Sequence, residues 1–237
     1  MEQSIINYDY NTLLYFPLFY VLLKIQYEII YTYLYLTYYN IIYKLPYHKR
    51  LYIIKNFSKS INLGLFSLFS IPYILYPIIL NHPCNNHLYH ICGAFYSSND
   101  LFALINVPKI SKTTRNHHII TISLSIISFS VDFNKSELGK MLFIYTLFST
   151  YAFIVNYYLG SRFFHNYEKN NKIRVLSRNI YTCSLFLNWT WHIFHFIQNY
   201  HILSYQHFIY YFMLYWIIKD DIILLNWLNK KSILIKS

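Results

Sequence analysis

Residues 117–125 read HHIITISLS, and they place two adjacent histidines at the start of a membrane-length apolar stretch. Ionisable side chains at membrane depth are costly, so they usually mark a substrate or proton path. Histidine titrates near neutral pH, which suits it to proton transfer or nucleophilic attack. The stretch therefore predicts a membrane helix, and it makes His117 and His118 candidate catalytic residues. The alternative is a polar cap at a membrane interface, beside Arg115 and Asn116.

The composition around this stretch is that of a membrane protein rather than a soluble domain. Of the 237 residues, 56% are hydrophobic and 12% are charged, whereas a typical soluble domain carries roughly 25% charge. The net charge of +11 would suggest nucleic-acid binding in a soluble protein. Here the basic residues are dispersed between apolar segments, so we expect them to orient a membrane protein. We expect no nucleic-acid partner.

Seven apolar segments are candidate membrane helices, since a hydrocarbon core of about 30 Å needs about 20 residues. They cover residues 12–43, 61–80, 88–107, 119–133, 139–160, 179–199 and 206–229. The first is overlong and has Lys24, Gln26 and Glu28 in its middle. The fourth is short unless it extends to include the histidines. We predict an all-α, multi-pass transmembrane helical bundle of six to seven spans.

Lys and Arg residues alternate between the segments that connect these candidates. Sixteen of the 20 lie in residues 44–60, 108–118, 161–178 and the C-terminal tail, and residues 81–87 and 200–205 carry none. Cytoplasmic loops are enriched in Lys and Arg, so we expect a lumenal or external N-terminus and a cytoplasmic C-terminus. The histidine pair then lies at the cytoplasmic end of its helix, where a water-soluble co-substrate meets a lipid.

Acidic side chains occur at two places inside the apolar segments. Asp100 falls half-way along the third segment, where a carboxylate must pair or become protonated. It either orients a histidine or makes a structural hydrogen bond to another helix. Lys219, Asp220 and Asp221 interrupt the seventh segment. They form either a self-neutralised kink or the far wall of the cavity that holds the histidines.

Two further histidine groups have spacings that raise the question of metal binding. His192 and His195 lie on one helical face, but the neighbouring Trp189 and Trp191 favour an interfacial aromatic belt. A turn on the predicted lumenal side carries four candidate zinc ligands, which are His82, Cys84, His87 and His90. The alternative is that this turn is an ordinary loop without a metal. We expect no metal site.

The cysteines and the missing motifs exclude several classes of protein. Cys84, Cys92 and Cys183 do not make a disulfide framework. We interpret them as free thiols, with a Cys84–Cys92 bridge as the alternative. The chain has no Gly-rich phosphate loop, no GxSxG nucleophile elbow and no CxxC pair. It also lacks the HxxxH and HxxHH boxes of membrane di-iron hydroxylases and desaturases, so we exclude that class.

The stretch from Asp100 to Asn156 resembles the core of the TLC domain family, which includes the ceramide synthases and smaller non-synthase membrane proteins. The segment from His117 to Thr121 closely resembles the His-His-x-x-Thr stretch of the ceramide synthases. Other resembling segments are Gly93-Ala94-Phe95-Tyr96, Glu137-Leu138-Gly139, Ser149-Thr150, Lys55-Asn56-Phe57-Ser58, Asp221 and Asn226-Trp227. Together they extend the resemblance over about residues 50–230.

This resemblance implies a TLC-type domain over residues 50–231, after an N-terminal helix and basic loop over 1–49 and before a cytoplasmic tail over 232–237. It implies a helical bundle around a lipid-sized cavity, in the endoplasmic reticulum membrane, that acts in membrane lipid homeostasis. His117 and His118 would be the catalytic pair and Asp100 their acidic support, in N-acylation of a long-chain base by acyl-CoA. Four basic side chains would attract the anionic coenzyme A: Lys112, Arg115, Arg174 and Arg178.

One departure separates the chain from the ceramide synthases. Those enzymes carry a His-Asp and a Ser-Asp element about one helix after the pair, where residues 144–150 here contain neither an acid nor a histidine. The two functional hypotheses are therefore an acyl-CoA-dependent N-acyltransferase and a non-catalytic lipid sensor, regulator or trafficking factor. A transporter requires an internal repeat or paired broken helices, and the sequence has neither. We expect membrane lipids as partners and acyl-CoA as a co-substrate, and a homo-oligomer stays open.

Overall fold

The computed structural model describes residues 10–80 and 82–230, and within them the chain is helical and contains no strand. The predicted all-α fold is thus confirmed, while the predicted tail 232–237 lies outside the described residues. The elements are α1 (Tyr10–Leu13), α2 (Tyr15–Ile42), α3 (Tyr47–Ser70), the π-helix η1 (Ile71–Leu75), α4 (Tyr76–Leu80), α5 (Asn86–Asn106), α6 (Lys112–Ser128), α7 (Glu137–Thr150), α8 (Phe153–Ser161), α9 (Tyr167–Asn199), the 3₁₀-helix η2 (Tyr200–Ile202) and α10 (Tyr205–Asn229).

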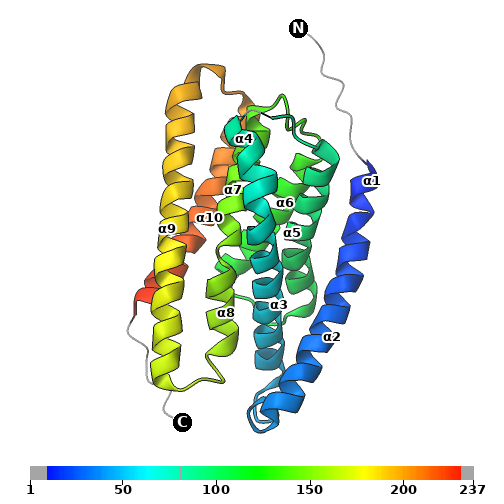
Figure 1. The fold of residues 1–237 in the computed structure, drawn as a ribbon, viewed down its shortest axis with the longest axis vertical. Helices are drawn as coiled ribbons and strands as arrows, with labels where there is room; N and C mark the ends of the chain where they lie inside the picture. The colour runs from blue at the N-terminus through cyan, green and yellow to red at the C-terminus, as the bar shows by residue number, and fades with distance from the viewer. Residues whose placement is uncertain (1–9, 81, 231–237) are drawn as a thin grey trace.

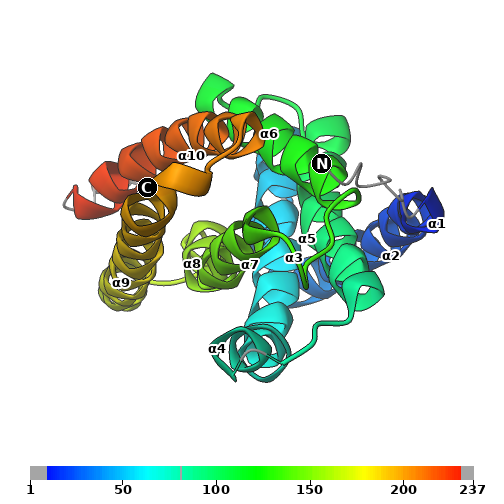
Figure 2. The same cartoon turned by 90° about the horizontal axis from the view of Figure 1, so that it is seen from above.

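The long helices run up and down along one axis (Figure 1). One end of the bundle holds the end of α10 and three connections, α2–α3, α5–α6 and α8–α9. We call it the basic end, because most of the Lys and Arg residues lie in or near these connections. Seen from above (Figure 2), α3, α5, α6, α10, α9 and α8 form a closed ring in which each helix contacts its neighbours. α2 packs outside this ring, against α3 and α5. The ring therefore creates an interior that six helices share.

Several predicted boundaries are corrected. The third and seventh segments agree closely with α5 and α10, but the predicted loop 44–60 is mostly the first half of α3. The predicted loop 161–178 likewise lies mostly in α9, which starts at Tyr167 after the cap Asn166. α6 covers 112–128 instead of 119–133, and it begins where the Ser111 hydroxyl accepts a hydrogen bond from the Thr114 amide. Hydropathy marks where an apolar run begins, whereas capping residues decide where a helix begins.

A π-helical turn that contains Pro72 connects α3 to α4, and a second proline, Pro77, lies in α4. Pro77 has no N–H to donate to the Tyr73 carbonyl one turn earlier. The hydroxyl of Tyr89, on α5, donates to that carbonyl at 2.6 Å and satisfies it. A proline in the sequence thus creates a point at which α5 is fastened to the α3–α4 segment.

The predicted fifth segment is one helical path with a break. It divides at Tyr151-Ala152 into α7 and α8. Two hydroxyls on α9 donate to carbonyl oxygens next to the break: Ser184 to Phe148 at 2.6 Å and Ser177 to Ile154 at 3.0 Å. Small hydroxyl side chains of this kind let two helices approach closely, so α9 stabilises the break.

Among the described helices, the α7–α8 path Glu137–Ser161 is the one whose length and apolar content suit a membrane crossing. The other helices carry many Tyr, Asn, His and Lys residues between their apolar ones. The multi-pass character therefore stays a prediction.

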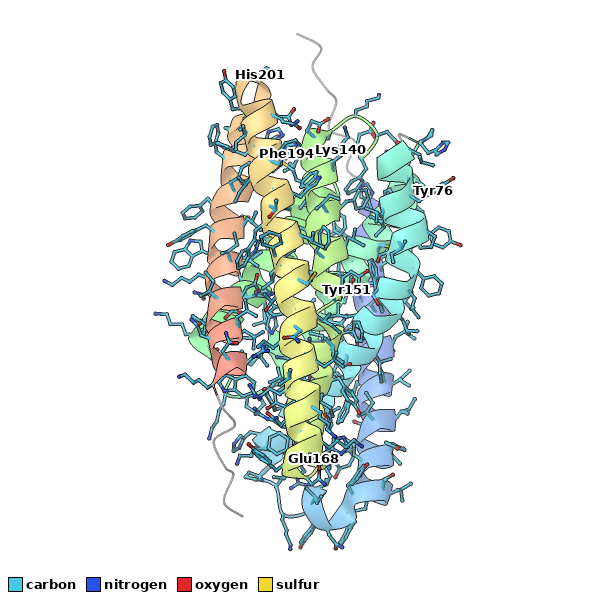
Figure 3. All side chains as sticks on the ribbon, turned by 60° about the vertical axis from the view of Figure 1, so that its left-hand side comes forward. Tyr76, Lys140, Tyr151, Glu168, Phe194 and His201 are labelled. Atoms are coloured by element: carbon cyan, nitrogen blue, oxygen red, sulfur yellow. The ribbon has the colours of Figure 1, made fainter. Side chains whose placement is uncertain are left out.

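The bundle exposes many apolar side chains on its outside, and its interior combines hydrophobic clusters with many polar side chains. Many large apolar side chains on its outside are exposed, including Leu36 at 77%, and Phe194 and Tyr76 (labelled in Figure 3) at 57% and 58%. Polar side chains fill much of the inside, among them Asn56, Asn62, Ser70, Asp100, Ser177, Asn188 and Asp221. Soluble monomers rarely expose apolar surface on this scale.

A polar clamp explains why α2 tolerates Gln26 in its middle. The Gln26 side chain exchanges hydrogen bonds with the Asn62 amide, at 3.0 Å in each direction, and accepts one from the Ser58 hydroxyl at 2.8 Å. Asn62 also donates to Asn99 at 2.7 Å. This clamp joins α2, α3 and α5. Lys24 and Glu28, which flank Gln26, are exposed.

Gly139 provides a test of packing at the start of α7. A Cβ placed there would lie 2.9 Å from Phe133 Cδ1, 3.1 Å from Phe133 Cα and 3.2 Å from Val131 Cγ1. We expect Gly139→Ala to lower the free energy of unfolding by about 1–3 kcal/mol, because the loop backbone must move. Gly93→Ala is the matched control, since its nearest atoms lie at 3.5 and 3.6 Å. Equal unfolding midpoints for the two variants would contradict this expectation.

Asp132 provides a test of pH dependence in the loop between α6 and α7. The Asn86 amide donates to its Oδ1 at 2.8 Å and holds the pKa of the Asp132 carboxyl below its ordinary value. Because the pKa is lower in the folded chain, this group stabilises the fold above its unfolded pKa, and the stabilisation is lost as the pH falls through the folded pKa. Thermal unfolding midpoints of wild type and Asp132→Asn should therefore differ at neutral pH and converge in acid. A constant difference would rule out this contribution.

Candidate functional site

The ring of helices encloses a cavity of about 360 Å³ that reaches the surface at the basic end. The exposed residues Ser111, before α6, and Trp227, near the end of α10, line its mouth. Polar and charged side chains line it further in: Lys55, Asn56, Lys59, Thr114, His117, His118, Tyr145, Ser149, Asn156, Arg162, Tyr181, Asp220 and Asp221. Every helix of the ring contributes to the lining, α5 through Tyr96. The histidine pair predicted from the sequence therefore faces a cavity.

Asp100, Lys59 and His118 meet at one carboxylate oxygen. Asp100 Oδ1 lies 2.5 Å from Lys59 Nζ and 2.9 Å from His118 Nδ1, although the His118 contact is poorly aligned for a hydrogen bond. The side chains of Asp100 and His118 are 1% and 3% exposed. The cluster joins α3, α5 and α6. The predicted neighbourhood of Asp100 and His118 is therefore present in the structure.

His117 faces a different carboxylate. Its Nδ1 lies 3.4 Å from Asp220 Oδ2 on α10, and the two side chains are 16% and 17% exposed. The two imidazole rings are nearly perpendicular, with centroids 5.8 Å apart. Adjacent residues on a helix point about 100° apart, which is how one pair contacts both α5 and α10.

The charged triplet of α10 divides between the two sides of the helix. Asp220 and Asp221 line the cavity, as the second interpretation of this triplet requires. The Tyr181 hydroxyl of α9 donates to Asp221 Oδ1 at 2.6 Å. Lys219 is exposed, and its Nζ lies 5.0 Å from the centre of the Trp216 ring.

The four cations predicted to attract coenzyme A are not among the described residues that line this cavity. Lys112 and Arg115 are exposed on the first turns of α6. Arg174 is buried and donates to the Leu228 and Lys230 carbonyls at the end of α10. Arg178 bonds the neighbouring Asn179 side chain. Arg174 thus joins two helices instead of facing a ligand.

Three other cations do line the cavity: Lys55, Lys59 and Arg162. The two lysines lie in residues 44–60, which their charge pattern predicts to be a basic loop. A helical pattern was available in the sequence, since residues 52, 55, 56, 59 and 63 recur at the spacing of one helix face. That spacing would have placed both lysines on a buried face of α3.

Within residues 10–80 and 82–230, no group of three or more His, Cys, Asp and Glu side chains is arranged to hold a metal ion. His192 contacts the Asn188 carbonyl and the Tyr210 hydroxyl, each at 2.8 Å, through its two ring nitrogens. His195 Nε2 lies 3.2 Å from Glu137 Oε2. The two histidines therefore fasten α9 to α10 and α7. All three cysteines are free thiols, so the Cys84–Cys92 bridge is absent.

The chain matches no protein-family model, no curated protein and no solved structure. The geometry of the cavity therefore carries the functional argument.

Proposed function

We propose that this chain is a multi-pass membrane protein of TLC type that binds a lipid in the central cavity and transfers an acyl group to its amine. The many exposed apolar side chains support the membrane setting, because such a surface suits a hydrocarbon solvent. α9 supports it further. Its 33 residues give a length of about 50 Å, enough to cross a core of about 30 Å and carry its basic first turns into water.

The observation that carries the catalytic proposal is the His118–Asp100 couple beside the cavity. Asp100 Oδ1 lies 2.9 Å from His118 Nδ1, a contact that needs only a small rotation to become a hydrogen bond, and His118 Nε2 is buried with no partner among the described residues. A carboxylate on one ring nitrogen leaves the other nitrogen to act as a base. His118 is thus the general base, and Asp100 positions it.

The proposed reaction is acyl transfer from a thioester to an amine. The amine nitrogen attacks the thioester carbonyl carbon and forms a C–N bond, and His118 Nε2 takes the proton that the nitrogen loses. The C–S bond then breaks, and the imidazolium returns the proton to the departing thiolate. The products are an amide and a thiol, and His118 ends in its starting state.

A second candidate function is lipid binding without catalysis, as in a sensor, regulator or trafficking factor. Lys59 supports this function, because its Nζ lies 2.5 Å from Asp100 Oδ1, the same oxygen that faces His118 Nδ1. Because Lys59 neutralises this carboxylate, the carboxylate makes the imidazole of His118 a weaker base than it would without the lysine. The same ion pair is also what a purely structural junction of three helices requires.

The deciding experiment is an acyl-transfer assay on membranes that contain this protein, given labelled acyl-CoA and a long-chain base. Formation of an N-acylated product that His118→Gln abolishes would support the enzyme. Absence of product with a panel of bases and acyl chains, from folded and membrane-inserted protein, would leave lipid binding as the function. Membranes without the protein give the background.

A further inference from the structure

Lys55 places an ammonium in the cavity wall that no carboxylate contacts directly, although Asp100 and Asp220 act on it at longer range. The residue is 7% exposed, and its ammonium has no hydrogen-bond or ion-pair partner in the described chain. The carboxylates of Asp100 and Asp220 face Lys59, His118 and His117 instead. A buried charge without a partner is costly, so this ammonium is suited to an anion from outside the protein.

Arg162 adds a second such cation nearer the mouth. Its guanidinium carbon lies 5.8, 5.0 and 5.1 Å from the ring centres of Tyr52, Phe163 and Trp227. Its Nε is buried without a hydrogen-bond partner, and no carboxylate pairs with it in the part of the chain that the structure describes. The aromatic rings hold the guanidinium plane but satisfy none of its N–H groups.

The two cations lie at neighbouring depths along α3. Tyr52, which contacts Arg162, precedes Lys55 by three residues, or about 4.5 Å of helix axis. Lys59, which reaches the His118–Asp100 couple, lies another turn further in. The order from the mouth inward is therefore Arg162, Lys55, and then the candidate catalytic pair.

We propose that Lys55 and Arg162 form a phosphate-binding subsite at the mouth of the cavity. An ammonium and a planar guanidinium are the side chains that proteins combine around phosphoryl oxygens. The phosphoryl group belongs either to a soluble ester such as coenzyme A or to a lipid headgroup. In both cases the acyl or lipid chain extends inward past Lys59 to His118. This direction rests on the proposed function, whereas phosphate binding does not.

The test is binding of labelled adenosine 3′,5′-bisphosphate, which carries phosphoryl groups but no acyl chain, to the full chain in phospholipid-free detergent. Wild type should bind the probe, and added salt should weaken binding. Lys55→Met and Arg162→Gln should each weaken it by about tenfold to a hundredfold, because each removes a charged hydrogen-bond donor. Lys55→Arg, which keeps the charge, should retain most of the affinity.

Lys49→Gln and Lys169→Gln are the matched controls, since they remove the same charge from exposed positions on the first turns of α3 and α9, outside the cavity lining. They should change the affinity by less than about twofold. An equal loss in these controls, or no binding by wild type, would overturn the subsite. Competition by added phospholipid assigns the subsite to a headgroup, and its absence assigns it to a soluble ester.

This outcome is separable from that of the proposed reaction. His118→Gln should abolish acyl transfer and still bind the probe with the affinity of wild type. Loss of probe binding in this variant, with the fold retained, would contradict the separation of the phosphate subsite from the catalytic pair.

Discussion

Replacing His118 by glutamine should lower N-acyl transfer by roughly 10²- to 10⁴-fold, the range that a positioned general base contributes. The amide is similar in size to the imidazole but cannot take the amine proton. His117→Gln should cost less, because His117 Nδ1 lies 3.4 Å from Asp220 at a more exposed position. The measurement is the initial rate of amide formation at saturating acyl-CoA, with equal amounts of folded protein.

His201→Gln is the control for this comparison. His201 is exposed on η2, at the end of the bundle away from the cavity mouth (Figure 3). Its loss should leave the rate unchanged. If His117→Gln were the inactive variant and His118→Gln kept the wild-type rate, the assignment of the base would be reversed.

Replacing Asp100 by asparagine should lower the free energy of unfolding by about 3–5 kcal/mol, the cost of removing one partner of a buried ion pair. The Lys59 side chain is only 12% exposed and would keep its charge without a counterion. The double variant Lys59→Met/Asp100→Asn should recover most of this loss, because it removes the stranded charge as well. Denaturant unfolding in detergent, followed by near-UV circular dichroism, measures all three proteins.

Glu168→Gln is the matched control, since it removes a carboxylate that pairs with Lys172 while both side chains are 74% exposed. Its effect should be below about 0.5 kcal/mol. A double variant no more stable than Asp100→Asn alone would show that the carboxylate stabilises the fold through contacts other than Lys59.

The apolar segments predict most of the helices, because the central turns of each helix consist of the residues of one such segment. α5 and α10 follow their predicted segments to within two residues, since their apolar runs begin just after the caps Asn85 and Ser204 that start the helices. α3 and α9 begin well before their predicted segments. Their first turns are basic and polar, and hydropathy cannot distinguish such a helix from a charged loop.

The site was predictable only in part, for a related reason. The contact between Asp100 and His118 agrees with one of the two alternatives that the sequence leaves open for Asp100, and their depths in the two helices do not decide between them. Lys59 is not predictable in this way, because it is 41 residues from Asp100 and the first half of its helix has the charge pattern of a loop. Arg174 was predicted to face coenzyme A because of its charge, but the carbonyls that it satisfies belong to the end of a helix 54 residues away.

The junction at Asp100 also bears on how the protein is made. A ribosome releases Lys59 first, Asp100 second and His118 last, because this is their order in the chain. The carboxylate therefore emerges after its ammonium partner and before the histidine, and pairing with Lys59 lowers the cost of burying it. α3 and α5 then form the platform on which the histidine helix docks. The order of residues along the chain therefore lets the ion pair of the candidate site form before the histidine that faces it arrives.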